Sequence, residues 1–99
     1  MELNLSDKIA LVTAASQGLG KAAAIELAKE GCNLIICSSN KRKIEESARD
    51  IEKISNNKVT AVTTDLRDSK QIDLLFNQIN SEYGGVDVVV NNAGGPPIS

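Results

Sequence analysis

Four short runs of apolar residues divide the chain, and a longer segment separates each run from the next. The runs are rich in Val, Ile and Leu and cover residues 9–12, 34–37, 59–62 and 86–90. The apolar residues are mostly continuous rather than alternating, interrupted only by Thr60 and Asp87, which is typical of parallel strands covered on both faces. The pattern therefore predicts four buried parallel strands.

The three intervening segments favour helices. Residues 19–29 are rich in Ala, a strong helix former whose small side chain allows close packing against a sheet. The other two carry an apolar stripe at helical spacing: residues 41–55 with Ile44, Ala48 and Ile51, and residues 69–83 with Ile72, Leu75, Phe76 and Ile79.

Residues at the ends of these segments agree with the alternation. Gly31 and Gly84 follow the first and third helices, Asn40 precedes the second, and Asp68 with Gln71 resembles a capping box. Strands that alternate with helices imply right-handed crossovers and a parallel sheet with helices on both faces. The predicted fold class is α/β, a doubly wound parallel sheet.

Composition sets the broad class of protein. The chain has 99 residues, enough for one domain, of which 41% are hydrophobic and 24% charged, as in soluble globular proteins. A net charge of -2, with one Tyr, one Phe and no Trp, argues against nucleic-acid binding. The sequence has neither the apolar region of a signal peptide nor the roughly 20 apolar residues of a membrane span, so we expect a cytoplasmic protein without membrane contact.

Two cysteines, Cys32 and Cys37, lie in one predicted extended segment. Five residues of extended chain separate them by about 16 Å, well beyond the roughly 7 Å that a disulfide allows. The chain contains no His, which makes a zinc site improbable. We expect two reduced thiols in the core and no metal site.

A glycine-containing turn joins the first strand to the first helix. It reads Thr-Ala-Ala-Ser-Gln-Gly-Leu-Gly from Thr13 to Gly20. Glycines let the backbone approach a phosphate, and a helix N-terminus offers unpaired N–H groups and a partial positive charge. Taken alone, the segment could equally be an ordinary tight turn between a strand and a helix.

The end of the fourth strand makes the pattern specific. The early Thr-x4-Gly-x-Gly is followed about 70 residues later by Asn-Asn-Ala-Gly at residues 91–94. Together these motifs resemble the signature of the short-chain dehydrogenase/reductase family. The resemblance extends over the whole chain and implies a Rossmann-type fold, truncated here after its fourth strand, with the C-terminal catalytic half of the domain absent.

The resemblance also implies which residues contact a dinucleotide. The glycine turn would surround the pyrophosphate and the adenosine ribose, through Ala14, Ser16, Gln17, Gly18, Leu19 and Gly20. Asp65 and Leu66 would meet the adenine, and Asn92, Ala93 and Gly94 would line the approach to the nicotinamide ribose. Ala14 departs from the family, which usually has glycine there; a methyl group is tolerable at this position if φ is negative.

The end of the second strand bears on the choice between NAD and NADP. Family members that use NAD place an acidic residue there to hold the ribose 2′-hydroxyl. This chain instead has Ser38, Ser39, Asn40, Lys41 and Arg42, followed by Lys43. Cations in the first turn of a helix oppose its dipole by about 0.3–1 kcal/mol each, so a bound anion would relieve the mismatch. The segment favours NADP, with NAD possible; the alternative is a solvated basic turn balanced by Glu45 and Glu46.

No catalytic residue is expected within the chain. The family's chemistry resembles general acid catalysis by a Tyr with a Lys four residues later. Tyr83 has no Lys at that spacing and is more simply the last apolar residue of the third helix. The absence of His also excludes a Ser-His-Asp triad.

The sequence thus predicts the cofactor-binding part of an NAD(P)-dependent oxidoreductase. The parent enzyme would transfer hydride between NADP(H) and a small carbonyl or alcohol substrate, and it resembles 3-oxoacyl-carrier-protein reductases and sugar dehydrogenases of the family. The 99 residues alone would be inactive, and the apolar edge at 86–90 would favour a homo-oligomer. The alternative is a non-catalytic dinucleotide-binding or subunit-interaction module.

Overall fold

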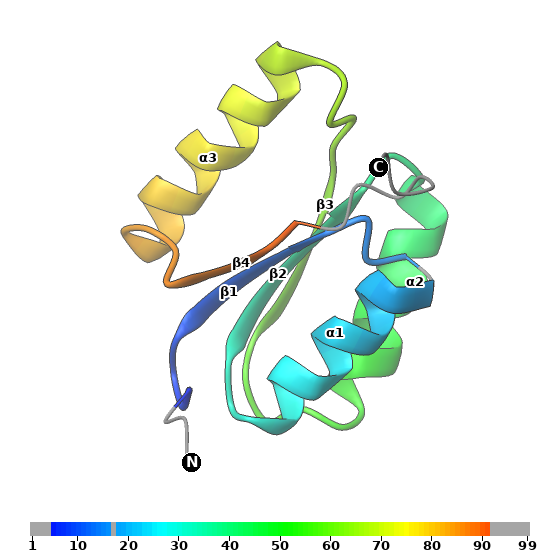
Figure 1. The fold of residues 1–99 in the computed structure, drawn as a ribbon, viewed down its shortest axis with the longest axis vertical. Coiled ribbons are helices and arrows are strands. Elements are labelled where there is room, and N and C mark those ends of the chain that lie inside the picture. The colour runs from blue at the N-terminus through cyan, green and yellow to red at the C-terminus, as the bar shows by residue number, and fades with distance from the viewer. Residues whose placement is uncertain (1–4, 17, 92–99) are drawn as a thin grey trace, which may run out of the picture.

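The fold is a four-stranded parallel sheet between two layers of helices (Figure 1). The computed structural model describes residues 5–16 and 18–91. In chain order the elements are β1 (Ile9–Thr13), α1 (Gly18–Lys29), β2 (Asn33–Ser38), α2 (Lys41–Glu52), β3 (Val59–Thr63), α3 (Ser69–Tyr83) and β4 (Val88–Val90). The predicted α/β class is confirmed.

The strand order places β1 inside the sheet. The order is β3-β2-β1-β4, and every neighbouring pair is parallel. The chain runs outward from β1 through β2 to β3 and then returns to the other side of β1 to form β4. Ala10, for example, pairs with Leu34 of β2 on one side and with Val88 of β4 on the other. This reversal makes the carboxyl end of β1 a topological switch point, where open α/β sheets bind ligands.

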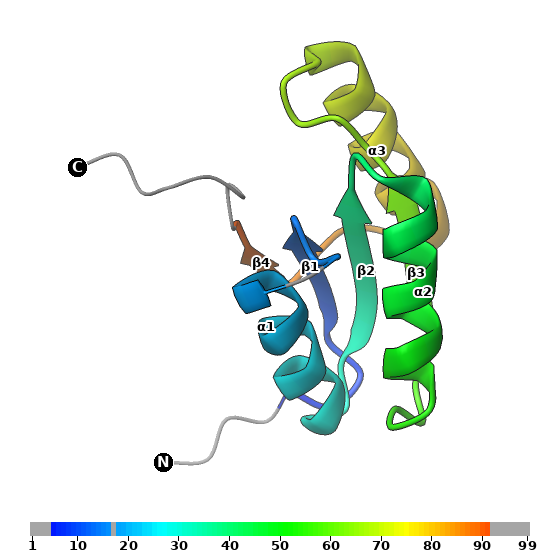
Figure 2. The same cartoon turned by 90° about the vertical axis from the view of Figure 1, so that its right-hand side faces the viewer.

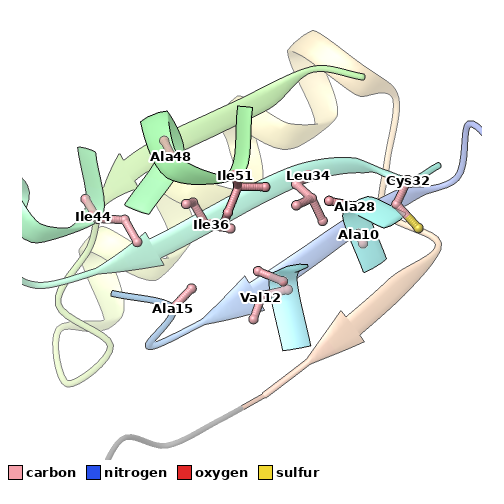
Figure 3. Close-up of a cluster of buried hydrophobic side chains, with 11 residues drawn as sticks. Ala10, Val12, Ala15, Ala28, Cys32, Leu34, Ile36, Ile44, Ala48 and Ile51 are labelled. Atoms are coloured by element: carbon pink, nitrogen blue, oxygen red, sulfur yellow. The ribbon is translucent and has the colours of Figure 1, made fainter. Parts of the chain in front are cut away.

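Helices cover both faces of the sheet, as continuous apolar strands require. Figure 2 shows α1 and α2 on one face and α3 on the other. Alternate strand residues divide between the two cores. Val12, Leu34 and Ile36 pack with α1 and α2 (Figure 3), whereas Leu11 and Ile35 pack with α3.

Most of the predicted helix ends are confirmed. Asn40 caps α2, its side-chain oxygen accepting a hydrogen bond from the backbone N–H of Lys43. Gly84 caps α3 in the left-handed conformation, with φ of 77°, and Gly31 follows α1 with φ of 90°. The second helix ends at Glu52, earlier than its predicted end at Ser55.

The predicted capping box at α3 is wrong. Asp68 is the N-cap, but its backbone N–H donates to the carbonyl oxygen of Asp65 in a tight turn. That N–H is therefore already satisfied, and the Gln71 side chain has no donor to accept from at the N-cap. Its Oε1 accepts instead from the backbone N–H of Asp65, at 2.8 Å.

The predicted apolar stripe of α3 is only partly buried. Leu75 and Ile79 are enclosed, Ile72 is half-buried, and Phe76 is 39% exposed. The single helix on this face turns one row of side chains onto the sheet and leaves the flanking row at the solvent. β4 is likewise less enclosed than predicted, and Val89 is 52% exposed.

The two cysteines are free and buried, as predicted. Among the helices of residues 5–16 and 18–91, none is long and apolar enough to cross a membrane. The same residues contain no group of three or more His, Cys, Asp or Glu side chains placed to hold a metal ion.

Candidate functional site

The candidate residues gather at the end of the sheet where the carboxyl ends of the strands lie. The turn after β1, the start of α2 after β2, Asp65 after β3 and Asn91 after β4 all follow the carboxyl ends of parallel strands. Backbone hydrogen bonds join these segments: the N–H of Ala15 donates to Cys37 O at 3.1 Å, and that of Thr64 to Ser38 O at 2.8 Å. The candidate site therefore lies where the strand order reverses.

The turn after β1 brings its backbone against the start of α1. A Cβ built on Gly20 would lie 2.2 Å from the carbonyl oxygen of Ala14 and 2.9 Å from its carbonyl carbon, so only glycine fits there. Gly18, the first residue of α1, has φ of 62° and open space where a side chain would be. The first backbone N–H groups of α1 have no partner within the helix, and this end can accept an anion.

The expectation that Ala14 has a negative φ is wrong. Its φ is 51°, in the left-handed region, rather than negative. Ala14 is the first residue after β1, and the N–H of the next residue, Ala15, donates to Cys37 O. A methyl group in this conformation costs about 1–2 kcal/mol, which explains why glycine suits the position better.

The end of β2 offers exposed polar and cationic groups. Ser38 is buried, and its hydroxyl interacts with the backbone of Asn40, while the Asn40 side chain caps α2. Ser39, Lys41 and Arg42 are exposed. Asn40 is exposed as well, so Ser38 is the one buried residue among the five predicted contacts in this segment.

The alternative of a basic turn balanced by Glu side chains has some support. Arg42 Nε lies 3.6 Å from Glu46 Oε1, one helical turn later. The Arg42 side chain is nevertheless 85% exposed. Exposed pairs of this kind contribute little, so the guanidinium can exchange this partner for a bound anion at small cost.

Asp65 is held as an ionised carboxylate at the edge of the site. Hydrogen bonds from the side chain and backbone of Arg67 hold the pKa of Asp65 below its ordinary value. Gln71 fixes the backbone of the same residue. Leu66 is half-buried against the core beneath α3. The pair predicted to meet an adenine is therefore firmly placed.

Thr13, which was not among the residues expected to contact the dinucleotide, connects the end of β1 to the end of β4. The Thr13 hydroxyl donates to Asn91 Oδ1 at 3.1 Å and lies 3.4 Å from the Val90 carbonyl oxygen. Thr13 is the first residue of the Thr-x4-Gly-x-Gly motif and Asn91 the first of Asn-Asn-Ala-Gly. Their places in these motifs could have indicated the contact. Four expected contacts, Gln17, Asn92, Ala93 and Gly94, lie outside the described residues.

Cys37 and Tyr83 carry groups that act as nucleophiles or acids in many enzymes, and both pack in the core under α3. Burial raises the pKa of the Cys37 thiol to about 11, partly opposed by a hydrogen bond with the backbone of Ala14, so the thiol stays neutral. Tyr83 ends α3, packs in the core beneath that helix, and has its hydroxyl 2.5 Å from Thr60 Oγ1. Thr60 stands near the start of β3, so Tyr83 lies away from the candidate site.

The parallel sheet with its reversal at β1, the glycine turn and the helices on both faces define a Rossmann-type α/β protein. Within that class, the sequence model of the short chain dehydrogenase family matches residues 8–99 of this chain. The chain belongs to the short-chain dehydrogenase family.

Individual relatives agree with this assignment. The chain is 37% identical over 90 residues to an uncharacterized oxidoreductase of Staphylococcus aureus strain MW2, covering 91% of this chain and 38% of that protein. It is 39% identical over 89 residues to the short chain dehydrogenase/reductase dpchG of Colletotrichum higginsianum, covering 90% of this chain and 33% of that protein.

A solved structure supports the fold. L-Sorbose reductase from Gluconobacter frateurii, in complex with NADPH and L-sorbose, superposes with a TM-score of 0.92 at 31% identity, covering 98% of this chain and 37% of that chain. The present chain thus spans between 33% and 38% of the length of these proteins.

Proposed function

We propose that this chain is the cofactor-binding part of an NADP(H)-dependent oxidoreductase. The parent protein would transfer hydride between NADP(H) and a small carbonyl or alcohol compound. The observation that carries the proposal is the start of α1. Gly20 lies so close to Ala14 O that no side chain fits, and open space adjoins Gly18 at a helix N-terminus.

The residues present fit a dinucleotide. Backbone N–H groups of the turn, from Ala14 through Ser16, Gln17, Gly18 and Leu19 to Gly20, would hold the pyrophosphate. Asp65 and Leu66 would hold the adenine, and Asn92, Ala93 and Gly94 would line the nicotinamide end. When bound, the nicotinamide supplies or accepts the hydride; this chain's own residues bind and orient it.

The preference for NADP rests on the exposed groups after β2. Ser39, Lys41 and Arg42 face solvent there, and no carboxylate stands among residues 38–43. The NADPH complex of L-sorbose reductase, whose backbone matches closely, supports the same choice. A 2′-phosphate beside Lys41 and Arg42 would also relieve their repulsion with the helix dipole.

Calorimetric titration with NADPH and NADH, on the longest soluble form of the protein, tests the proposal. We expect tighter binding of NADPH. Because charge-assisted bonds to phosphate are strong, the Lys41→Glu/Arg42→Glu double variant should lose about tenfold or more of its NADPH affinity and keep its NADH affinity. A matched control, Lys29→Glu/Lys53→Glu, makes the same change of net charge away from this edge and should change neither.

Equal or tighter binding of NADH by the unmodified protein would contradict the cofactor preference. So would an unchanged NADPH affinity in the Lys41/Arg42 variant. Failure to bind either dinucleotide would contradict the function itself.

We further propose that the 99 residues form the N-terminal part of one Rossmann domain whose catalytic groups lie elsewhere in the protein. Tyr83, the only tyrosine of the chain, is remote from the site. The chain made alone should therefore not oxidise NADPH with any carbonyl substrate. It should also associate through the exposed edge of β4, where Val89 is half exposed, and light scattering over a range of concentrations would detect this.

The second candidate is a dinucleotide-binding or subunit-interaction module without turnover. The remoteness of Tyr83 favours it for the isolated chain. A longer open reading frame that encodes a Tyr with a Lys four residues later would favour the enzyme for the parent protein.

A further inference from the structure

A buried serine on α2 reaches out of its own helix to the turn after β1. Ser47 is 1% exposed, and its hydroxyl donates to the carbonyl oxygen of Ser16 at 3.0 Å, across 31 positions of the sequence. Serine inside a helix often bonds back to a carbonyl of the preceding turn of that helix. Here the hydroxyl instead satisfies a carbonyl of another segment.

The acceptor, the carbonyl oxygen of Ser16, lies just before the N-terminus of α1. Ser16 lies two residues before Gly18, where α1 begins, and its carbonyl belongs to the backbone that leads into the helix N-terminus. The bond holds this carbonyl against α2, so that its negative end does not turn toward an anion at the start of α1. A half-buried carbonyl without a partner would also cost free energy, so the contact favours one conformation of the turn.

A second contact joins the same two elements. Asp50 follows Ser47 by three residues, on the same side of α2, and its Oδ2 lies 2.8 Å from Nζ of Lys21 in the first turns of α1. Hydrogen bonding to Lys21 holds the pKa of Asp50 below its ordinary value. The Asp50 side chain is half exposed, and exposed ion pairs contribute little, so the buried hydroxyl of Ser47 is the more important of the two contacts.

We infer that Ser47 is a positioning residue for the phosphate-binding turn: through the Ser16 carbonyl it fixes the backbone that would receive the pyrophosphate. The inference rests on the proposed function. It extends the site to a residue in the middle of α2, on the helix whose first residues are proposed to meet the 2′-phosphate. The pyrophosphate is common to NADH and NADPH, so Ser47 acts on both cofactors alike, whereas Lys41 and Arg42 distinguish between them.

The test is titration calorimetry of the full-length protein with NADPH and with NADH. Ser47→Ala should raise both dissociation constants by the same factor, about tenfold, which corresponds to about 1.4 kcal/mol. The number of sites per folded protein should not change. Ser47→Thr, which keeps the hydroxyl, should stay within about threefold of the unmodified protein.

Ser55→Ala serves as the matched control. It removes a serine hydroxyl that also bonds to backbone, that of Asn57, in the loop before β3 at the opposite edge of the sheet. It should leave both dissociation constants unchanged.

Three results would overturn the inference. In the first, Ser47→Ala binds both cofactors as tightly as the unmodified protein. In the second, fewer sites titrate with unchanged affinity, as expected from a general loss of folded protein. In the third, NADPH binding alone weakens, which would assign Ser47 to the 2′-phosphate. If the unmodified protein binds neither cofactor, the proposed function fails before any variant is compared.

Discussion

The two faces of the sheet are built from the same strands but are packed very differently. Among residues 5–16 and 18–91, the face under α1 and α2 holds a cluster of eleven buried residues, whereas the face under α3 holds five. The helices α1 and α2 cover the first face, and α3 covers the second (Figure 2). Phe76 and Val89 are consequently left partly exposed beside α3, while Ile44 and Ile51 of α2 are fully enclosed.

The glycine turn of the candidate site belongs to the more fully packed face. The buried residues of α1 are Gly20, Ala24 and Ala28, one per turn, so this helix can approach the sheet closely. Close approach also brings its N-terminus against the turn after β1. A binding site that uses backbone N–H groups needs a backbone held in one conformation. The close packing on this face holds the backbone of the turn after β1 in place.

The largest expected effect is that of Gly20→Val, at the start of α1. Its side chain would collide with the carbonyl of Ala14, so the turn and the helix would have to separate. We expect dinucleotide affinity to fall at least about a hundredfold and the free energy of unfolding to fall by about 3 kcal/mol. Calorimetric titration and urea unfolding measure the two quantities.

Ala22→Val places the same side chain on an exposed position of α1 and is the control. It should have little effect on binding. A well-folded Gly20→Val protein, as judged by circular dichroism, that bound the dinucleotide normally would show that the cofactor does not use this turn.

A matched pair of core substitutions compares the two faces directly. Ile51 and Ile79 are both buried isoleucines on helices, one beneath α2 and one beneath α3. Ile51→Ala should lower the free energy of unfolding by about 4 kcal/mol and Ile79→Ala by about 2 kcal/mol, because the thinner layer under α3 can relax around the cavity. Urea unfolding of both variants gives the difference; equal losses would mean that the two faces are equally rigid.

The smallest expected effect is a gain, at the first residue of the turn. Ala14 has a positive φ, which glycine adopts without steric cost. Ala14→Gly should raise the free energy of unfolding by about 1 kcal/mol. Ala22→Gly, at an exposed helical position, should instead lower it by about 1 kcal/mol. A loss in both variants would show that Ala14 is not strained.

Local patterns in the sequence predicted most of the elements. The stripe of α3 predicted its bounds, Ser69–Tyr83, residue for residue, and the spacing of Ile44, Ala48 and Ile51 identified the buried side of α2. The glycine turn and the polar end of β4 carried the family resemblance. These features depend on neighbouring residues, which the sequence presents directly.

Other features depended on residues far apart along the chain. The sequence does not specify that Gln71 Oε1 accepts from the backbone N–H of Asp65 rather than from that of Asp68, because the bond that occupies the Asp68 N–H arises only once the turn has formed. The exposure of Phe76 likewise follows from how many helices share that face of the sheet.

The sequence by itself determined the α/β class, the order of elements and the motifs at the ends of the strands, because periodicity and turn residues are local properties. Only the tertiary structure decided that Ala14 takes a left-handed conformation and that Ser47 holds Ser16. Both follow from packing β1, α1, β2 and α2 together. The contact across 31 positions exists only when the sheet and its helices have assembled, and no local pattern encodes it.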